Sequence, residues 1–185
     1  MPRKVFISFY GGDEKEVGTF VMWAHRNGAL IPKILHDAYS GVWVDSTNTD
    51  YVMQRVRDEF IGDSTVTMVL LGRCTHSRRY VDWEIKATLQ QGETYSANGL
   101  LAVNLPSIGN AGVHLPPRFL DNYKASPNAG HARYYAAPST GSELAGWIED
   151  AFSARTTRAT LITNSRDMMR YNAKCQHCGV VHPAS

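Results

Sequence analysis

The chain has 185 residues, of which 43% are hydrophobic and 19% are charged, and its formal net charge is +2. This composition is typical of a folded globular protein, and the length fits one domain with a sizeable core. The small charge and the scattered basic residues exclude a strongly basic nucleic-acid-binding protein. No apolar run reaches the roughly 18 residues of a membrane span, and the chain starts in a strand-like segment rather than a signal peptide, so we expect a cytoplasmic protein without a membrane partner.

Apolar, β-branched segments alternate with helical patterns along the chain. Strands are predicted at residues 5–10, 41–46, 64–72, 99–106 and 132–138. The segment 64–72 is almost continuously apolar, which is typical of a central strand that is covered on both faces of a parallel sheet. A strand followed by a helix, repeated along the chain, predicts right-handed crossovers and a doubly wound open α/β sheet.

The predicted helices are marked by apolar residues with a period of 3.6. The helix that spans 78–92 has Val81, Ile85 and Leu89 on one face, and its Asp82 is spaced to pair with Lys86. The last helix opens with a capping box from Thr140 to Glu143. The buried positions expected in the other helices are Val17, Phe20, Val21 and Ala24 in the first, Val52, Val56 and Phe60 in the second, and Leu144, Trp147, Ile148, Ala151 and Phe152 in the last.

Two parts of the chain fit this repeat less well. Residues 107–130 contain prolines, glycines and asparagines, and such a long irregular stretch is either a flap or contains a short helix. The apolar pattern fades beyond about residue 155. We therefore expect a domain at 1–155 and a C-terminal extension at 156–185.

The extension contains a C-x-x-C-G sequence formed by Cys175 and Cys178, with His177 and His182 nearby. This arrangement resembles half of a zinc ribbon, which normally takes a second pair of ligands from elsewhere. Cys74 is the only other cysteine, and it lies in the domain itself. With three cysteines and no second pair, we predict neither a disulfide framework nor a metal site, and we interpret the extension as a loose tail or a dimer contact.

An acidic residue near the start of the third helix is the main candidate for chemistry. Glu84 lies one turn after Tyr80 and next to Trp83. In doubly wound sheets, ligands bind outside the carboxyl ends of the strands, and this helix follows such an end. By itself, the pattern leaves two alternatives: a carboxylate stabilised by the helix dipole at the surface, or a catalytic acid.

Four segments of the chain resemble the TIR-like domain of bacterial Thoeris anti-phage defence. They are KVFISFYGGD at 4–13, VWVDS at 42–46, STVTMVLLG at 64–72 and HSRRYVDWEI at 76–85, in the family's order. The resemblance covers about residues 3–105. It implies a flavodoxin-like, TIR-like sheet of five parallel strands in the order 2-1-3-4-5, with helices on both faces. The family commonly has tryptophan where this chain has Tyr80.

The resemblance also implies an activity. In this family the glutamate of the third helix is catalytic, which assigns that role to Glu84. The enzyme that the resemblance implies is an NAD nucleosidase and ADP-ribosyl cyclase. NAD would be its substrate, no further cofactor would be needed, and the cyclic product would signal to a separate effector. A phage-derived trigger and a homo-oligomer are further partners to be expected.

The implied reaction gives a physical reason for these residue types. Breaking the bond between nicotinamide and ribose develops positive charge on the ribose, which a fixed carboxylate stabilises. Aromatic rings that exclude water favour cyclisation over hydrolysis. The residues expected to line the NAD site are the aromatic Phe9, Tyr10, Tyr80 and Trp83, the glycines Gly11 and Gly12, and the strand-end residues Asp45 and Ser46.

Several of these residues also have simpler interpretations. Asp45 is equally well explained as a turn residue. Arg78 and Arg79 either hold a pyrophosphate or are solvated. A TIR-type domain can also act only as an interaction scaffold, in which case the acid is incidental. A response-regulator receiver is disfavoured, because the third strand ends in LLGRC without the required aspartate.

Overall fold

The computed structural model describes residues 1–34, 56–92, 95–124, 126 and 129–183. Its sheet has five parallel strands in the order β2-β1-β3-β4-β5. The predicted fold class and strand order are therefore confirmed. The strands are β1 (Arg3–Ser8), β2 (Leu30–Ile34), β3 (Val66–Leu71), β4 (Gly99–Asn104) and β5 (Arg133–Tyr135).

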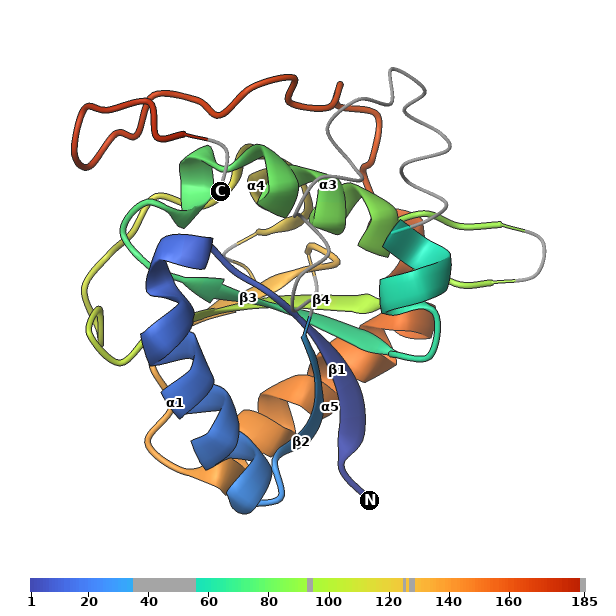
Figure 1. Cartoon of the computed structure of the whole chain (residues 1–185). Coiled ribbons are helices and arrows are strands. Elements are labelled where there is room, and N and C mark those ends of the chain that lie inside the picture. Colours follow the sequence, from blue (N-terminus) through green and yellow to red (C-terminus); the bar gives the residue numbers. More distant parts are fainter. Residues whose placement is uncertain (35–55, 93–94, 125, 127–128, 184–185) are drawn as a thin grey trace.

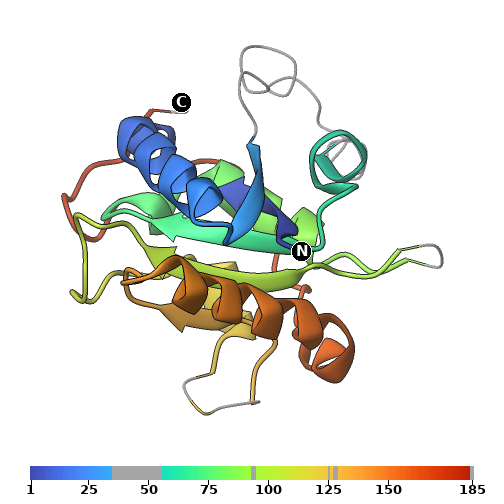
Figure 2. The same cartoon turned by 90° about the horizontal axis from the view of Figure 1, so that it is seen from below.

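Helices cover both faces of the sheet (Figure 1). Seen from below, α1 and α5 lie on the near side of the strands (Figure 2). On the other face lie α3 and α4. The bounds are α1 (Glu14–Arg26), α3 (Arg79–Thr88), α4 (Pro117–Asn122) and α5 (Gly141–Thr157), with the short 3-10 helices η1 (Gly11–Asp13), η3 (Thr75–Ser77) and η4 (Ala159–Leu161) and the π-helix η2 (Val56–Ile61).

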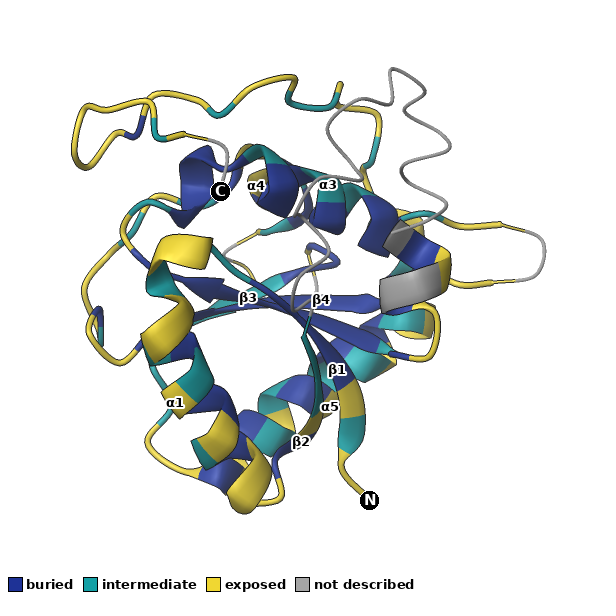
Figure 3. Ribbon diagram, viewed as in Figure 1, coloured by how far each residue is buried: buried dark blue, intermediate teal, exposed yellow. Residues whose placement is uncertain are grey.

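The alternation of side chains along each strand divides the core into two clusters. Val5 and Ile7 of β1 point toward α1 and α5, together with Met68 and Leu70 of β3. The intervening residues of β3 point toward α3 and α4, where they meet Val81, Ile85 and Phe119. All six residues of β3 are buried, as predicted for a central strand, and Figure 3 shows β3 and β4 in the dark blue of buried residues.

The edge strand beside β1 is a different segment from the one predicted. The sequence placed the second strand at 41–46, which lies outside the described residues, whereas β1 pairs with β2 at Leu30–Ile34. This segment contains Pro32, which lacks an amide hydrogen and therefore argues against a central strand. An edge strand tolerates proline because only one side of it is paired.

The C-terminal elements follow their local signals closely. Thr140 caps α5 by accepting a hydrogen bond from the Glu143 amide at 3.1 Å, and the Glu143 carboxylate accepts one from the Ser139 amide at 2.7 Å. The helix runs to Thr157, two residues past the predicted end of the domain. The stretch 107–130 contains the short helix α4, which starts at Pro117, a favourable first residue. Within the described parts of the chain, no helix combines the length and apolar character that a bilayer crossing needs.

Amide exchange tests this arrangement. We expect the amides of β3 to exchange most slowly, because the strand is buried and paired on both sides by β1 and β4. The amides of the edge strand β2 serve as the internal comparison and should exchange faster. Native-state hydrogen exchange read by NMR measures both, and fast exchange throughout Val66–Leu71 would contradict the topology.

Candidate active site

The candidate site lies at the carboxyl ends of β1 and β3, where α3 begins. Ser8 is the last residue of β1 and faces α3, the opposite face from Ile7. Its hydroxyl donates a hydrogen bond to Oε2 of Glu84 at 2.5 Å. Glu84 is only 4% exposed, because it lies on the same side of α3 as Val81 and Ile85. The first alternative from the sequence, a solvated carboxylate on the helix surface, is therefore wrong.

The second charged group of the site is the guanidinium of Arg78, the residue that precedes α3. The side chain lies over the ring of Tyr10, with Cζ 3.5 Å from the ring centroid. Arg78 is 4% exposed, and within the described part of the chain all three guanidinium nitrogens are buried without a hydrogen-bond partner. A buried cation without hydrogen bonds is costly. The Asp13 carboxylate acts on it electrostatically, and a bound anion would supply the hydrogen bonds that are missing.

The interpretation of Arg78 as a solvated residue is thus wrong, whereas Arg79 is accounted for structurally. Its guanidinium donates a hydrogen bond to the Tyr80 hydroxyl at 2.8 Å and another to the carbonyl of Arg170 at 3.3 Å.

Gly12 provides space for the Tyr10 ring, over which the Arg78 guanidinium lies. A Cβ atom at this position would lie 2.4 Å from Cε1 of Tyr10, so any other residue would displace the ring. Gly11 and Gly12 are both exposed in η1. Their predicted approach to a ribose or phosphate stays a prediction.

The predicted aromatic wall does not assemble as expected. Phe9 packs against the core cluster beneath α1 and α5, so the sheet separates it from Glu84. Tyr80 and Trp83 do lie together, with ring centroids 5.5 Å apart in an edge-on arrangement. Asp45 and Ser46 fall outside the described residues.

Glu84 does not line either of two sizeable hollows that are formed by described residues. The larger, of about 630 Å³, lies beside the start of α1, where burial and the neighbouring Glu16 raise the pKa of Asp13. The other, of about 530 Å³, lies between η2 and the segment before β4. The larger hollow is lined by Gly12, Asp13, Lys15, Glu16, Thr19, Phe20, Trp23, Pro106 and Pro138.

Comparison with protein families matches residues 6–109 to the TIR-like domain of the Thoeris protein ThsB. The chain belongs to this ThsB TIR-like family. The matched region contains the end of β1 and all of β3, α3 and β4, and therefore Ser8, Arg78 and Glu84. It ends before α4, so α5 and the C-terminal extension lie outside it.

The other comparisons add no argument about function. The search of curated proteins gives no match to the chain. Among solved structures, the chain is similar to a ribose 5-phosphate isomerase from Thermotoga maritima, at 14% identity and a TM-score of 0.32, with 89% of this chain and 90% of that chain covered. A likeness at this level carries no conclusion about the ThsB TIR-like domain.

The C-terminal extension packs across α3 of the TIR-like domain, as the red segment in Figure 1 shows. Asn172 caps the helix, because its Oδ1 accepts a hydrogen bond from the Arg79 amide at 2.8 Å. The indole of Trp83 donates to the carbonyl of Met169 at 2.8 Å, and the amide of Ala173 donates to the carbonyl of Ser77 at 2.9 Å. The predicted loose tail is therefore wrong, and the extension holds the predicted wall residue Trp83.

A buried ion pair also fixes the first turn of α3. Arg118 of α4 is fully buried and donates two hydrogen bonds to the Asp82 carboxylate, at 2.9 and 3.2 Å. Asp82 also accepts a hydrogen bond from the Met169 amide at 3.0 Å. Lys86, the partner predicted for Asp82, instead has its ammonium 3.5 Å from the carbonyls of Asn164 and Arg166.

Arg118 carries no signal that sequence reasoning could have used, because an arginine in an irregular stretch is ordinarily solvated. The two prolines that precede it mark the start of a helix, but they do not reveal what the helix contacts.

The fold also brings Cys74 to the two cysteines of the extension. Cys74, Cys175, Cys178 and His182 have ligand atoms that all lie within 4.8 Å of one another. Burial and the adjacent Cys175 and Cys178 thiols raise the pKa of Cys74 to about 12, which favours its neutral thiol form. The prediction of no metal site depended on a missing second pair of ligands, and Cys74 and His182 supply that pair.

Proposed function

We infer that this ThsB TIR-like protein acts in anti-phage defence by cleaving the bond between nicotinamide and ribose of NAD. The ADP-ribose part is then cyclised into a signal for a separate effector in the cytoplasm. The observation that carries the proposal is the placement of the family's glutamate, Glu84, as a buried carboxylate at the carboxyl edge of the sheet, bonded to Ser8.

Glu84 is suited to stabilise positive charge on a ribose. Cleavage develops an oxocarbenium-like ribose while nicotinamide leaves as a neutral molecule, so a fixed negative charge lowers the barrier. The hydrogen bond from Ser8 holds one carboxylate oxygen in place, and this limits the reorganisation that the reaction requires. Ser8 is a positioning residue in this mechanism.

Arg78 is suited to bind the pyrophosphate of the same molecule. Its guanidinium is fixed over Tyr10 and has no hydrogen bonds to described residues, so an anion would gain charge-assisted hydrogen bonds without displacing existing ones. Arg78 lies six positions before Glu84 in the sequence, which corresponds to about 9 Å along a helix axis. NAD is an extended molecule that is longer than this separation.

The direct test is incubation of the full chain with NAD, followed by mass spectrometry of the small molecules. Free nicotinamide together with a cyclic form of ADP-ribose supports the proposal. Linear ADP-ribose alone supports cleavage without cyclisation. Because a phage component can be required as a trigger, the same assay is made with extracts of infected cells. An intact NAD pool under both conditions would favour the interaction scaffold.

Replacing Arg78 by Gln tests the anion site. We expect KM for NAD to rise by about 10-fold to 100-fold, the equivalent of one charge-assisted hydrogen-bond partner, with a smaller change in kcat. The melting temperature should fall only modestly, because the change removes a buried charge that has no hydrogen bonds in the described structure together with its contact to the Tyr10 ring.

Arg79→Gln is the matched control at the neighbouring position. Its guanidinium contacts Tyr80 and the extension, so this change should affect stability more than KM. If Arg78→Gln left KM for NAD unchanged in an active, folded protein, the role of Arg78 in substrate binding would be refuted.

A further inference from the structure

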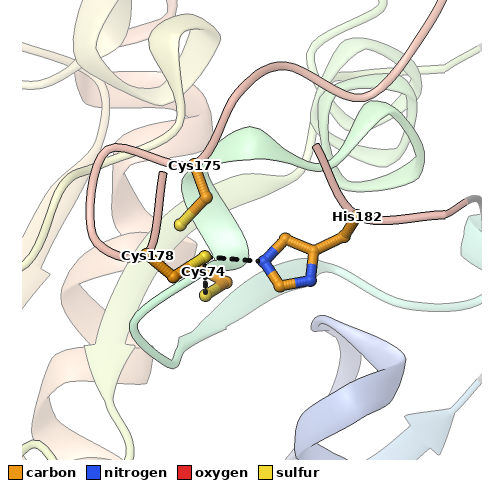
Figure 4. Close-up of side chains that lie close together, drawn as sticks. All are labelled: Cys74, Cys175, Cys178 and His182. Atoms are coloured by element: carbon orange, nitrogen blue, oxygen red, sulfur yellow. Dashed lines mark hydrogen bonds between the residues drawn. The ribbon is translucent and has the colours of Figure 1, made fainter. Parts of the chain in front are cut away.

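The cysteines and the histidine that meet at the end of the extension have the geometry of a zinc site (Figure 4). The sulfur atoms of Cys74 and Cys178 are 3.9 Å apart, and Nε2 of His182 is 3.1 Å from the Cys178 sulfur. Two sulfur ligands of one tetrahedral Zn²⁺, each about 2.3 Å from the metal, lie about 3.8 Å apart. We propose that Cys74, Cys175, Cys178 and His182 bind one structural Zn²⁺.

The backbone around Cys175 is already folded as a metal-binding turn. The Gly179 amide donates to the Cys175 carbonyl at 2.8 Å, and the Cys175 amide donates to the Val180 carbonyl at 2.9 Å. Gly179 has φ of +73°, a conformation that favours glycine and that lets the chain reverse directly after Cys178. Lys174 then pairs with Val181 in an antiparallel bridge, which returns His182 to the two cysteines.

The remaining ligand comes from a distant part of the chain. Cys74 lies in the segment after β3, 104 residues before Cys178. The turn is held against this segment by the Gln176 amide, which donates to Nε2 of His76 at 3.0 Å. Asn172 donates to the carbonyls of His182 and Pro183 at 3.1 and 3.0 Å, so the histidine segment is also fixed.

The set of ligands indicates a structural role. Three cysteines and one histidine complete a tetrahedral zinc shell and leave no position for substrate or water. A disulfide would use only two of the three sulfurs and would leave the histidine unexplained. All three cysteines are free thiols in the structure.

The metal would fasten the extension beside the candidate active site. The ring of His182 lies 5.7 Å from that of Tyr10, which supports the Arg78 guanidinium. By joining residues 175–182 to the end of β3, Zn²⁺ would hold the extension across the start of α3. This inference stands without the NAD activity, because it depends only on the four side chains and the backbone around them.

Metal analysis of the full chain tests the proposal. Protein purified without a metal-affinity step and under reducing conditions should contain about one zinc per chain. Cys178→Ser and His182→Ala should lose zinc at a chelator concentration that leaves the wild type loaded. Both positions are at least partly exposed, so these variants should fold. His177→Ala is the matched control, since this exposed histidine of the same turn is not one of the four ligands and should retain the metal.

Hydrogen exchange of the wild type gives a readout that is independent of catalysis. Removal of zinc by a chelator should increase exchange in residues 170–183 and at the start of α3, while β3 and β4 stay protected. A reduced wild type that neither contains nor takes up Zn²⁺ would overturn the proposal. So would unchanged zinc retention in both ligand variants, or a disulfide between two of the cysteines in protein prepared without an oxidant.

Discussion

Replacing Glu84 by Gln is expected to lower the rate of nicotinamide release from NAD by about 100-fold or more. Loss of one preorganised electrostatic group typically costs about 3 kcal/mol of transition-state stabilisation. The amide has nearly the shape of the carboxylate, and its oxygen can still accept the hydrogen bond from Ser8. Fold and melting temperature should therefore change little, although the side chain is buried. The measurement is initial nicotinamide release by equal concentrations of the two folded proteins.

Glu149→Gln is the matched control for this change. It has the same chemistry on the exposed face of α5, where Glu149 pairs with Arg3 at 2.8 Å. Its activity should equal that of the wild type. If the Glu84→Gln protein released nicotinamide at the normal rate, another acid would have to be catalytic, and Asp45 would be the next residue to test. Asp82 is a poor alternative, because Arg118 and the Met169 amide already occupy its carboxylate.

Replacing Arg118 by Met should lower the free energy of unfolding by about 3–5 kcal/mol, because it leaves the buried Asp82 carboxylate without its cation. The guanidinium also donates to the carbonyls of Arg166 and Asp167, at 2.9 and 3.0 Å, so the change would release the extension as well. Typical domains are stable by only about 5–15 kcal/mol, and the loss is a large part of this total. Urea unfolding, followed by circular dichroism, measures the effect.

The chain contains a matched control for this ion pair. Arg166 forms a similar two-point pair with Asp121, at 2.6 and 2.7 Å, but its side chain is 44% exposed. Arg166→Met should therefore cost no more than about 1 kcal/mol. Asp82→Asn added to Arg118→Met should recover part of the loss, because it removes the buried charge that the first change leaves unpaired. Equal destabilisation by the Arg118 and Arg166 changes would show that burial does not decide the strength of this pair.

The sequence was most informative where a local pattern reports burial. The continuous apolar run at 64–72 predicted the central strand β3, and the spacing of Val81, Ile85 and Leu89 predicted the helix that carries Glu84. The capping box at Thr140 marked the start of α5. Each of these signals depends on residues close together in the chain, so each can be detected without knowing what the element packs against.

The sequence was less informative where a residue's role depends on a distant partner. The second strand was predicted at 41–46, whereas the sheet pairs the segment 30–34 with β1 at its edge. No local pattern pointed to Arg118, which only the packing of α4 brings to Asp82. Phe9 and Tyr10 were both predicted to line the NAD site. Side chains alternate along a strand, however, and Phe9 packs on the opposite face of the sheet from Glu84.

By itself, the sequence determined the fold class, the central strand and the helix of Glu84, because hydrophobic periodicity specifies which face of an element is buried. Only the tertiary structure decided which groups meet: Ser8 with Glu84, Tyr10 beneath Arg78, and Cys74 with Cys175, Cys178 and His182. The physical reason is that periodicity identifies a buried face but not its partner. Contacts between residues 76 or 104 positions apart depend on how the whole chain closes around the sheet.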